Sequence, residues 1–143
     1  MHSLKNHLAY TETELSPAFH DLDPLNIVWH GNYVKYLEIA RCALLAKINY
    51  DYPQMQESGY IWPVVDVRLK YVRPLVYGKA VVISCAVVEW EHRLKISYRM
   101  CDKTTGQLLH KAHTVQVAID AKTQEMCYQT PTVLARCLGL DKV

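Results

Sequence analysis

The clearest pattern along the chain is a helical one over residues 33–48, "YVKYLEIARCALLAKI". Strong helix formers fill this segment, and it contains neither Gly nor Pro. Its charged residues keep to a narrow stripe made of Lys35, Glu38, Arg41 and Lys47. Apolar residues occupy most of the remaining circumference: Tyr36, Leu37, Ile39, Ala40, Ala43, Leu44 and Ile48. A helix so apolar around its girth is predicted to be mostly buried.

Pro53 and Gly59 mark the connection after the helix. Beyond them, the period of the hydrophobic positions changes from 3.6 residues to 2. Residues 64–72 and 93–100 alternate between apolar and polar, which predicts two strands with one face inside and one face in water. The predicted inward positions are Val65, Val67, Leu69 and Tyr71, and then Leu94, Ile96, Tyr98 and Met100. Residues 107–120 are a further strand candidate, preceded by the hairpin turn "DKTTGQ".

The segment 79–90, "KAVVISCAVVEW", is apolar on both of its faces. Such a strand must be covered on both sides. One helix covers only one side of a sheet in a chain of this length. The other side is therefore predicted to meet another subunit, in a homodimer or homotetramer.

The predicted order is a strand at about residues 9–20, a loop, the buried helix and a run of four antiparallel strands. A possible helix over residues 131–138 follows in the tail. This is an α+β arrangement, with one long buried helix wrapped by a curved antiparallel sheet of about five strands. No repeat, low-complexity tract or linker divides residues 1–143, so a single domain is expected.

Composition excludes several classes of protein. The formal net charge of the 143 residues is +2, without a basic face interleaved with aromatics, so nucleic-acid binding is not expected. No run approaches the roughly 18 apolar residues of a membrane span, and the start lacks the apolar core of a secretory signal. The five cysteines are widely spaced, without a C-x-x-C pair, which argues against a disulfide framework and a zinc site. A cytoplasmic protein with reduced thiols is expected.

Acids and imidazoles gather in one loop, "FHDLDPLNIVWHGNY" at residues 19–33, directly before the helix. The first N–H groups of a helix lack internal partners and attract negative charge. A carboxylate held beside them has the makings of a catalytic pair, in which the acid attacks or activates water and the N–H groups hold the oxyanion. The alternative is that Asp21 and Asp23 simply end a strand and cap turns.

Metal ligation is a weaker interpretation of the same residues. The loop histidines and aspartates match no known ligand spacing, and His110 and His113 lie three apart on a predicted strand, so they point to opposite faces. Cys42 on the helix has no identifiable His partner and is expected to be a buried thiol. Neither a metal nor another cofactor is predicted.

The segment 19–41, "FHDLDPLNIVWHGNYVKYLEIAR", resembles the signature of the 4-hydroxybenzoyl-CoA thioesterase family, within the hotdog acyl-CoA thioesterase superfamily. The family pattern is an Asp, a short turn, Val-Trp or Val-Tyr, His or Tyr, a small residue, Asn-Tyr, and a helix with Glu-x-Ala-Arg. The matching positions here are Asp23, Val28, Trp29, His30, Gly31, Asn32, Tyr33, Glu38, Ala40 and Arg41. The order of the strands that follow also agrees.

The resemblance implies a hotdog fold and hydrolysis of acyl-CoA or acyl-carrier-protein thioesters at a site shared between subunits. It assigns Asp23 as the catalytic carboxylate, either nucleophile or general base, and the backbone N–H of His30 as the group that polarises the carbonyl. It also implies substrate contacts by Asn26, Val28, Trp29, Gly31, Asn32 and Tyr33. Asn26 departs from the glycine of several relatives, so its side chain could reshape the acyl pocket.

Two further interpretations bear on this assignment. Some hotdog thioesterases use a helical glutamate as base, but Glu38 shares its stripe with Lys35 and Arg41, so an ion pair is predicted for it. The alternative function is a hotdog accessory protein that binds an acyl group without hydrolysing it. A hotdog dehydratase would need a "GHFP"-type loop, which is absent.

Overall fold

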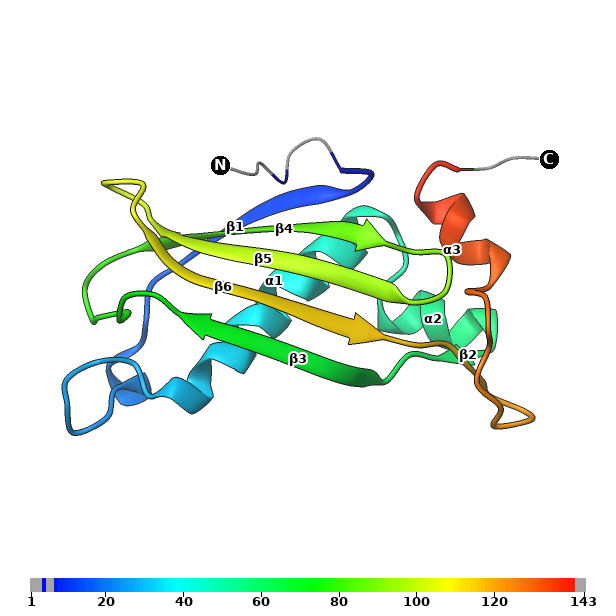
Figure 1. Cartoon of the computed structure of the whole chain (residues 1–143), viewed down its shortest axis with the longest axis horizontal. Coiled ribbons are helices and arrows are strands. Elements are labelled where there is room, and N and C mark those ends of the chain that lie inside the picture. Colours follow the sequence, from blue (N-terminus) through cyan, green and yellow to red (C-terminus); the bar gives the residue numbers. More distant parts are fainter. Residues whose placement is uncertain (1–3, 5–6, 141–143) are drawn as a thin grey trace.

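The computed structural model describes Leu4 and residues 7–140. The elements in chain order are β1 (Tyr10–Leu15), two 3-10 turns (Phe19–Asp21 and His30–Asn32), α1 (Tyr33–Lys47), α2 (Tyr52–Ser58), β2 (Tyr60–Ile61), β3 (Val64–Tyr71), β4 (Val81–Glu89), β5 (Leu94–Asp102), β6 (Leu108–Gln116), β7 (Ile119–Asp120) and α3 (Thr132–Cys137). One sheet runs β1-β4-β5-β6-β3 and is antiparallel throughout, with α1 across one face (Figure 1). The predicted fold class, a long helix against a five-stranded antiparallel sheet, is confirmed.

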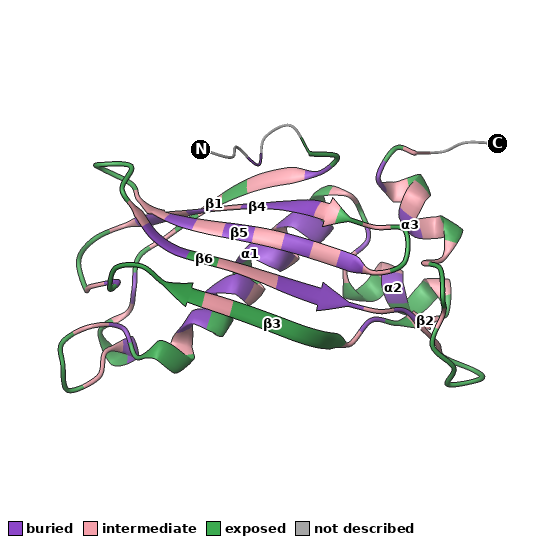
Figure 2. Ribbon diagram, viewed as in Figure 1, coloured by how far each residue is buried: buried purple, intermediate pink, exposed green. Residues whose placement is uncertain are grey.

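The hydrophobic core lies between α1 and the inner face of the sheet (Figure 2). The helix buries one side of its circumference there: Tyr33, Tyr36, Leu37, Ala40, Arg41, Leu44 and Leu45. The predicted inward residues of β5 are also buried: Leu94, Ile96, Tyr98 and Met100. This strand lies in the middle of the sheet, between β4 and β6. Its alternating pattern therefore corresponds to one buried face.

Two residues of α1 differ from the prediction. Ile39 was expected in the apolar girth, but 47% of it is exposed. Arg41 was placed on the polar stripe, yet it is only 3% exposed and forms an ion pair with Glu38 one turn earlier. The helix rests on the sheet with one side only, so its burial follows the line of contact with the sheet and not hydrophobicity alone.

The helix α2 was missed in the sequence. Asp51 caps its start by accepting a hydrogen bond from the N–H of Tyr52, and Pro53 lies in its first turn. Gly59 ends it in the left-handed conformation, with φ of +89°. Pro53 and Gly59 are thus the start and stop signals of a short helix, not the marks of a plain connection.

Two strands, β1 and β6, are shorter than predicted. The first strand was expected over residues 9–20 but ends at Leu15, two residues before Pro17, which has no N–H for a ladder. The strand predicted over residues 107–120 is divided between β6, which ends at Gln116, and the separate β7, which pairs with β2.

The strand β3 corrects the burial prediction for residues 64–72. Its alternation is present, but Val65 is 56%, Val67 40% and Tyr71 45% exposed. The reason is its position: β3 is an edge strand that pairs only with β6. Apolar surface that the sequence predicted to be internal therefore lies along an open edge of the sheet.

The outer face of β4 is only partly open. Ala86 on that face is buried, whereas Val82 and Val88 are half-buried. The larger exposed apolar surface is therefore the edge at β3, and the outer face of β4 is half-buried at Val82 and Val88.

Candidate active site

Asp21 ties the acidic loop to the start of α1. Its carboxylate accepts hydrogen bonds from Lys35 Nζ at 2.6 Å and from the hydroxyl of Tyr36 at 2.6 Å. Its backbone oxygen accepts from Asn32 Nδ2 at 2.8 Å and from the N–H of Trp29 at 2.9 Å. Asp21 is only 3% exposed, so these hydrogen bonds hold the loop together from its buried side.

The pKa of Asp21 follows from two opposing effects. Burial acts to raise it, but hydrogen bonds from Lys35, Tyr36 and the N–H of Ala18, with the charge of Lys35, bring the pKa below its ordinary value. Burial and the bond to Asp21 raise the pKa of Tyr36. Asp21 is therefore a fully engaged, ionised carboxylate with a structural role.

Asp23 is arranged differently, in a tight turn. Its N–H donates to the oxygen of Ile27 at 2.9 Å, and its own backbone oxygen accepts from the N–H of Asn26 at 2.9 Å. Its Oδ1 accepts from the N–H of Leu25 at 2.8 Å. Within Leu4 and residues 7–140, Oδ2 has no hydrogen-bond donor. One carboxylate oxygen thus fixes the side chain while the other is available to a substrate or water.

Asn26 closes this turn in the left-handed conformation, with φ of +65°. Glycine adopts that conformation without strain, and asparagine is one of the few other residues that tolerate it. The side chain of Asn26 is exposed and does not line the neighbouring pocket. The departure from glycine is therefore explained by the turn, and a narrowing of the acyl pocket by Asn26 does not follow from its position.

The start of α1 offers backbone N–H groups next to this turn. The N–H of Asn32 donates to the oxygen of Trp29 at 2.8 Å, and that of Val28 donates to the oxygen of Leu75 at 2.9 Å. Across the part of the chain that is described, the N–H of His30 has no such acceptor. The hydroxyl of Tyr71 donates to the oxygen of His30 at 2.8 Å, which fixes the next peptide group.

Gly31 is required by the close approach of Trp29. A Cβ atom at Gly31 would lie 2.3 Å from Cζ3 of the Trp29 ring, so any side chain would displace that ring. The ring of Trp29 also lies 5.2 Å, centroid to centroid, from the imidazole of His30. The small residue of the motif therefore lets a tryptophan lie across the helix start.

A pocket of about 300 Å³ joins Asp23 and His30. It is lined by Asp23, Leu25, Ile27, Val28, His30, Tyr33, Tyr71, Val72, Arg73 and Pro74. Of the predicted site residues, this brings together Asp23, Val28, His30 and Tyr33. The other four, Asn26, Trp29, Gly31 and Asn32, do not line the pocket but form the turn and the helix start beside it.

The sequence did not reveal the wall supplied by residues 71–74, which begin with the last residue of β3. Tyr71 packs edge-on against Tyr33 at 4.7 Å and against His110 at 4.9 Å, between ring centroids. His110 is fully buried, and neither ring nitrogen has a hydrogen-bond partner among the described residues. Burial lowers the pKa of His110 to about 4. The alternating pattern placed Tyr71 on the inner face, but no local signal connects it with residue 30.

A second, smaller pocket of about 90 Å³ lies between α1 and β3. It contains Glu38 and Arg41, whose ion pair is the one predicted from their shared stripe. Among the residues that the structure describes, no three His, Cys, Asp or Glu side chains are grouped closely enough to hold a metal ion.

Comparison with known proteins places the chain in a class. A family model described as the thioesterase-like superfamily matches residues 17–136, so the chain belongs to that superfamily. Its fold is the hotdog fold, and the resemblance carried by residues 19–41 is confirmed. No helix within the described residues is long and apolar enough to cross a membrane.

Particular relatives agree with that class. The chain is 27% identical over 117 residues to a 1,4-dihydroxy-2-naphthoyl-CoA hydrolase of Thermosynechococcus vestitus, covering 79% of this chain and 72% of that protein. It is 26% identical over 113 residues to YneP of Bacillus subtilis (strain 168), provisionally named an acyl-CoA thioesterase, covering 79% and 82%. A DHNA-CoA thioesterase structure from Staphylococcus aureus matches with a TM-score of 0.76 and 25% identity, covering 89% and 82%.

The buried carboxylate of Asp21 generates a prediction about acid stability. Because its pKa is lower in the folded chain, Asp21 contributes stability that is complete above the unfolded-state pKa and is lost as pH falls through the folded value. We expect Asp21→Asn to lower the free energy of unfolding at pH 7, and the gap to the parent to close as pH falls below about 4. Urea unfolding at a series of pH values measures this gap.

The control is Glu57→Gln, which removes an exposed carboxylate of α2. It should change the free energy of unfolding little at any pH. A gap for Asp21→Asn that stays constant from pH 7 to pH 3 would show that the charge of Asp21 does not matter to the fold.

Proposed function

We propose that this protein hydrolyses acyl-CoA thioesters, with Asp23 as the catalytic carboxylate and the backbone N–H of His30 as the oxyanion donor. The observation that carries the proposal is their arrangement in one pocket. Asp23 has a carboxylate oxygen without a donor, and the N–H of His30 lacks an acceptor in the described part of the chain. Membership of the thioesterase-like superfamily supports thioester hydrolysis as the reaction.

The proposed reaction begins with the thioester carbonyl oxygen at the N–H of His30. As negative charge develops on that oxygen, the N–H and the positive end of α1 stabilise it. The hydrogen bond from Tyr71 to the oxygen of His30 helps to keep the backbone in place. The groups are fixed before the substrate arrives, so little reorganisation is needed in the transition state.

Asp23 brings about attack on the carbonyl carbon by one of two routes. As a nucleophile, its free oxygen adds to the carbonyl carbon, the thiolate leaves and takes up a proton, and water then hydrolyses the acyl anhydride. As a general base, it takes a proton from a water molecule, whose oxygen adds to the carbonyl before the thiolate leaves. Both routes yield the free acid and the thiol.

The lining of the pocket favours an apolar or aromatic acyl group. Leu25, Ile27 and Val28 supply aliphatic surface, and Tyr33 and Tyr71 supply aromatic rings. Apolar pockets with a few polar groups are the usual form of small-molecule sites. The aromatic substrate in the name of the Thermosynechococcus vestitus relative makes aryl-CoA thioesters a natural part of the first screen, together with aliphatic chains and acyl-carrier-protein thioesters.

We also propose that the active form is a homodimer joined along β3. A long edge strand with exposed apolar side chains is a site for pairing with another chain. Val64, Val65 and Val67 are 37%, 56% and 40% exposed. The pocket between α1 and β3 borders the same edge, so a partner there would complete its wall. Such pairing places a second subunit next to the pocket of Asp23, which Tyr71 of β3 lines, and next to the pocket between α1 and β3.

Removal of the charge of Asp23 tests the catalytic assignment. We expect Asp23→Asn to lower kcat for the best thioester of the screen by at least about 10²-fold, because the base or nucleophile contribution disappears. Thiol release in a continuous assay measures this loss. The matched control is Asp102→Asn in the β5–β6 turn, where an amide oxygen can still accept the bonds from Thr104 and Thr105.

Equal activities of Asp23→Asn and Asp102→Asn would overturn the assignment of Asp23. A single turnover in H₂¹⁸O then separates the two routes in the parent enzyme. Label in Asp23 identifies the nucleophilic route, with water attacking the Asp23 carbonyl of the anhydride. Label in the product acid alone is the result of the general-base route and also of water attack on the acyl carbonyl of an anhydride, and chemical trapping of the anhydride separates these two. Binding of the acyl ligand without turnover in any thioester of the screen would support an accessory acyl-binding protein instead.

A charged substitution on β3 tests the dimer. We expect Val67→Lys to dissociate the dimer, because a lysine at the centre of the edge opposes pairing, and to lower thioesterase activity in parallel. Light scattering at the assay concentration measures the mass. The control is Glu12→Lys on β1, the opposite edge of the sheet, which should leave both mass and activity unchanged. A fully active parent monomer would refute the shared site.

A further inference from the structure

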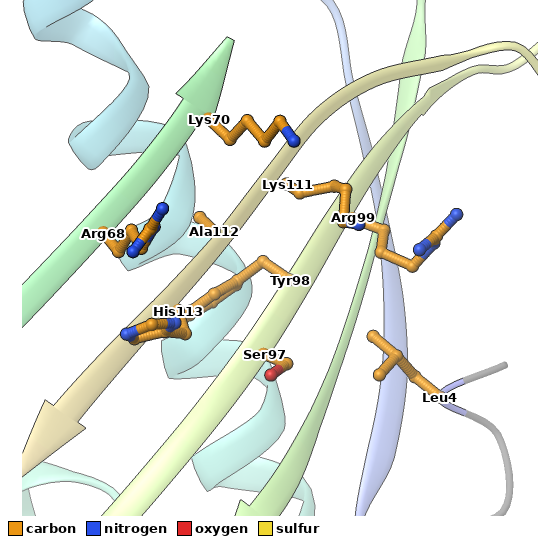
Figure 3. Close-up of a pocket in the computed structure, with 9 residues that line it drawn as sticks. All are labelled: Leu4, Arg68, Lys70, Ser97, Tyr98, Arg99, Lys111, Ala112 and His113. Atoms are coloured by element: carbon orange, nitrogen blue, oxygen red, sulfur yellow. The ribbon is translucent and has the colours of Figure 1, made fainter. Parts of the chain in front are cut away.

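A basic pocket lies on the face of the sheet that is turned away from α1 (Figure 3). Its volume is about 330 Å³. Four cationic side chains from three strands border it: Arg68 and Lys70 of β3, Arg99 of β5 and Lys111 of β6. We refer to these four as the basic cluster. None of them belongs to the pocket that contains Asp23.

The register of the sheet brings these cations side by side. In the strand register, Lys70 lies opposite Lys111, and Lys111 lies opposite Arg99. Three cations therefore lie side by side on adjacent strands. Strands are about 4.8 Å apart, which makes this row about 10 Å wide at the backbone. Arg68 and its neighbour His113 form the next row along the same strands. The cations therefore converge on one small area instead of spreading over the sheet.

Three of the four cations in the basic cluster lack a carboxylate partner within the part of the chain that is described. Among the described residues, Arg68, Lys70 and Lys111 have no carboxylate within salt-bridge distance, and the nearby Asp66 contacts His113 at 3.9 Å. The twelve other Lys and Arg residues of the chain are outnumbered by fourteen Asp and Glu. Burial first, and then the surrounding cations led by Lys95, lower the pKa of His113 despite Asp66. The positive charge of the chain is thus concentrated here.

The basic cluster lies close to the proposed thioester pocket along the chain. Lys70 immediately precedes Tyr71 and Val72, which line that pocket. Lys70 and Val72 are two residues apart, about 7 Å along a strand. A ligand with a long flexible arm could therefore reach from one pocket to the other around the end of β3.

We propose that the basic cluster binds the phosphate groups of the coenzyme A nucleotide while the thioester lies in the pocket of Asp23. This inference rests on the proposed function and adds the residues that hold the carrier. Coenzyme A carries a diphosphate and a 3′-phosphate on one nucleotide, and Arg and Lys are the residues that bind phosphate oxygens. A pocket of this size suits one small-molecule headgroup. A protein partner would need about 800 Å² of matching surface.

Binding of the nucleotide alone tests this inference without any turnover. The probe is adenosine 3′,5′-bisphosphate, titrated into the parent protein by calorimetry at low salt, with adenosine as the uncharged comparison. We expect Lys70→Ala combined with Lys111→Ala to weaken binding of the bisphosphate by at least about tenfold, because two charge-assisted contacts are lost. Lys79→Ala combined with Lys122→Ala removes two exposed lysines that do not border the pocket and should have no effect.

Steady-state kinetics test whether the basic cluster acts on the nucleotide of the acyl carrier and not on the acyl group. For the acyl-CoA substrate we expect the cluster variant to raise KM by about tenfold with little change in kcat. For the same acyl group on pantetheine, which lacks the nucleotide, the parent and the cluster variant should have equal kinetic constants. A dephospho-CoA thioester, without the 3′-phosphate, should fall between the two in the parent.

The outcomes separate the two proposals. If thioesters are hydrolysed but the cluster variant binds the bisphosphate as tightly as the parent, the phosphate site is refuted and the hydrolase proposal stands. If the bisphosphate binds at the cluster but no thioester is hydrolysed, the proposed function fails and the nucleotide site stands. An effect of the cluster variant on acyl-carrier-protein thioesters alone would assign the surface to an acidic protein and overturn the inference.

Discussion

The buried carboxylate of Asp21 is the interaction on which the candidate site depends. It joins the loop before α1 to the helix through Lys35 and Tyr36, while its backbone oxygen holds Trp29 and Asn32. An ionised group in this position is tolerable only because charged and neutral donors surround it. The same bonds that offset the cost of burying Asp21 therefore fix the path of the chain between residues 21 and 36.

Two neighbouring acids therefore have different roles, Asp21 in the fold and Asp23 in the candidate site. Asp21 is fully engaged, whereas Asp23, two residues later at a pocket, has one carboxylate oxygen without a donor among the described residues. The opposite wall comes from the end of β3, where Tyr71 reaches the backbone of His30. Behind it, the buried imidazole of His110 has no hydrogen bond to any residue that the structure describes, an exception to the usual satisfaction of buried polar groups.

Local patterns were enough to predict α1, the central strands and the loop that carries Asp23, because each of these depends on periodicity or on a dense motif. Spacing alone did not separate the roles of Asp21 and Asp23, since it does not tell which carboxylate turns inward, and Asp23 was assigned from the family resemblance. The exposure of β3 was also missed, because alternation predicts a face but not whether a neighbouring strand covers it. The basic cluster on three strands depends on register, and Tyr71 meets residue 30 only in the folded chain.

The central claim is that the backbone N–H of His30 polarises the thioester carbonyl, and infrared spectroscopy tests it most directly. The ligand is a thioester with a ¹³C-labelled carbonyl, bound to the Asp23→Asn variant so that it is not turned over. The account predicts that the carbonyl stretch of the bound ligand lies below its frequency in water. The shift should persist when His30→Ala is added and disappear with His30→Pro, in variants shown to be folded, because proline alone removes the N–H. An unshifted carbonyl, or a shift that survives His30→Pro, would contradict the account.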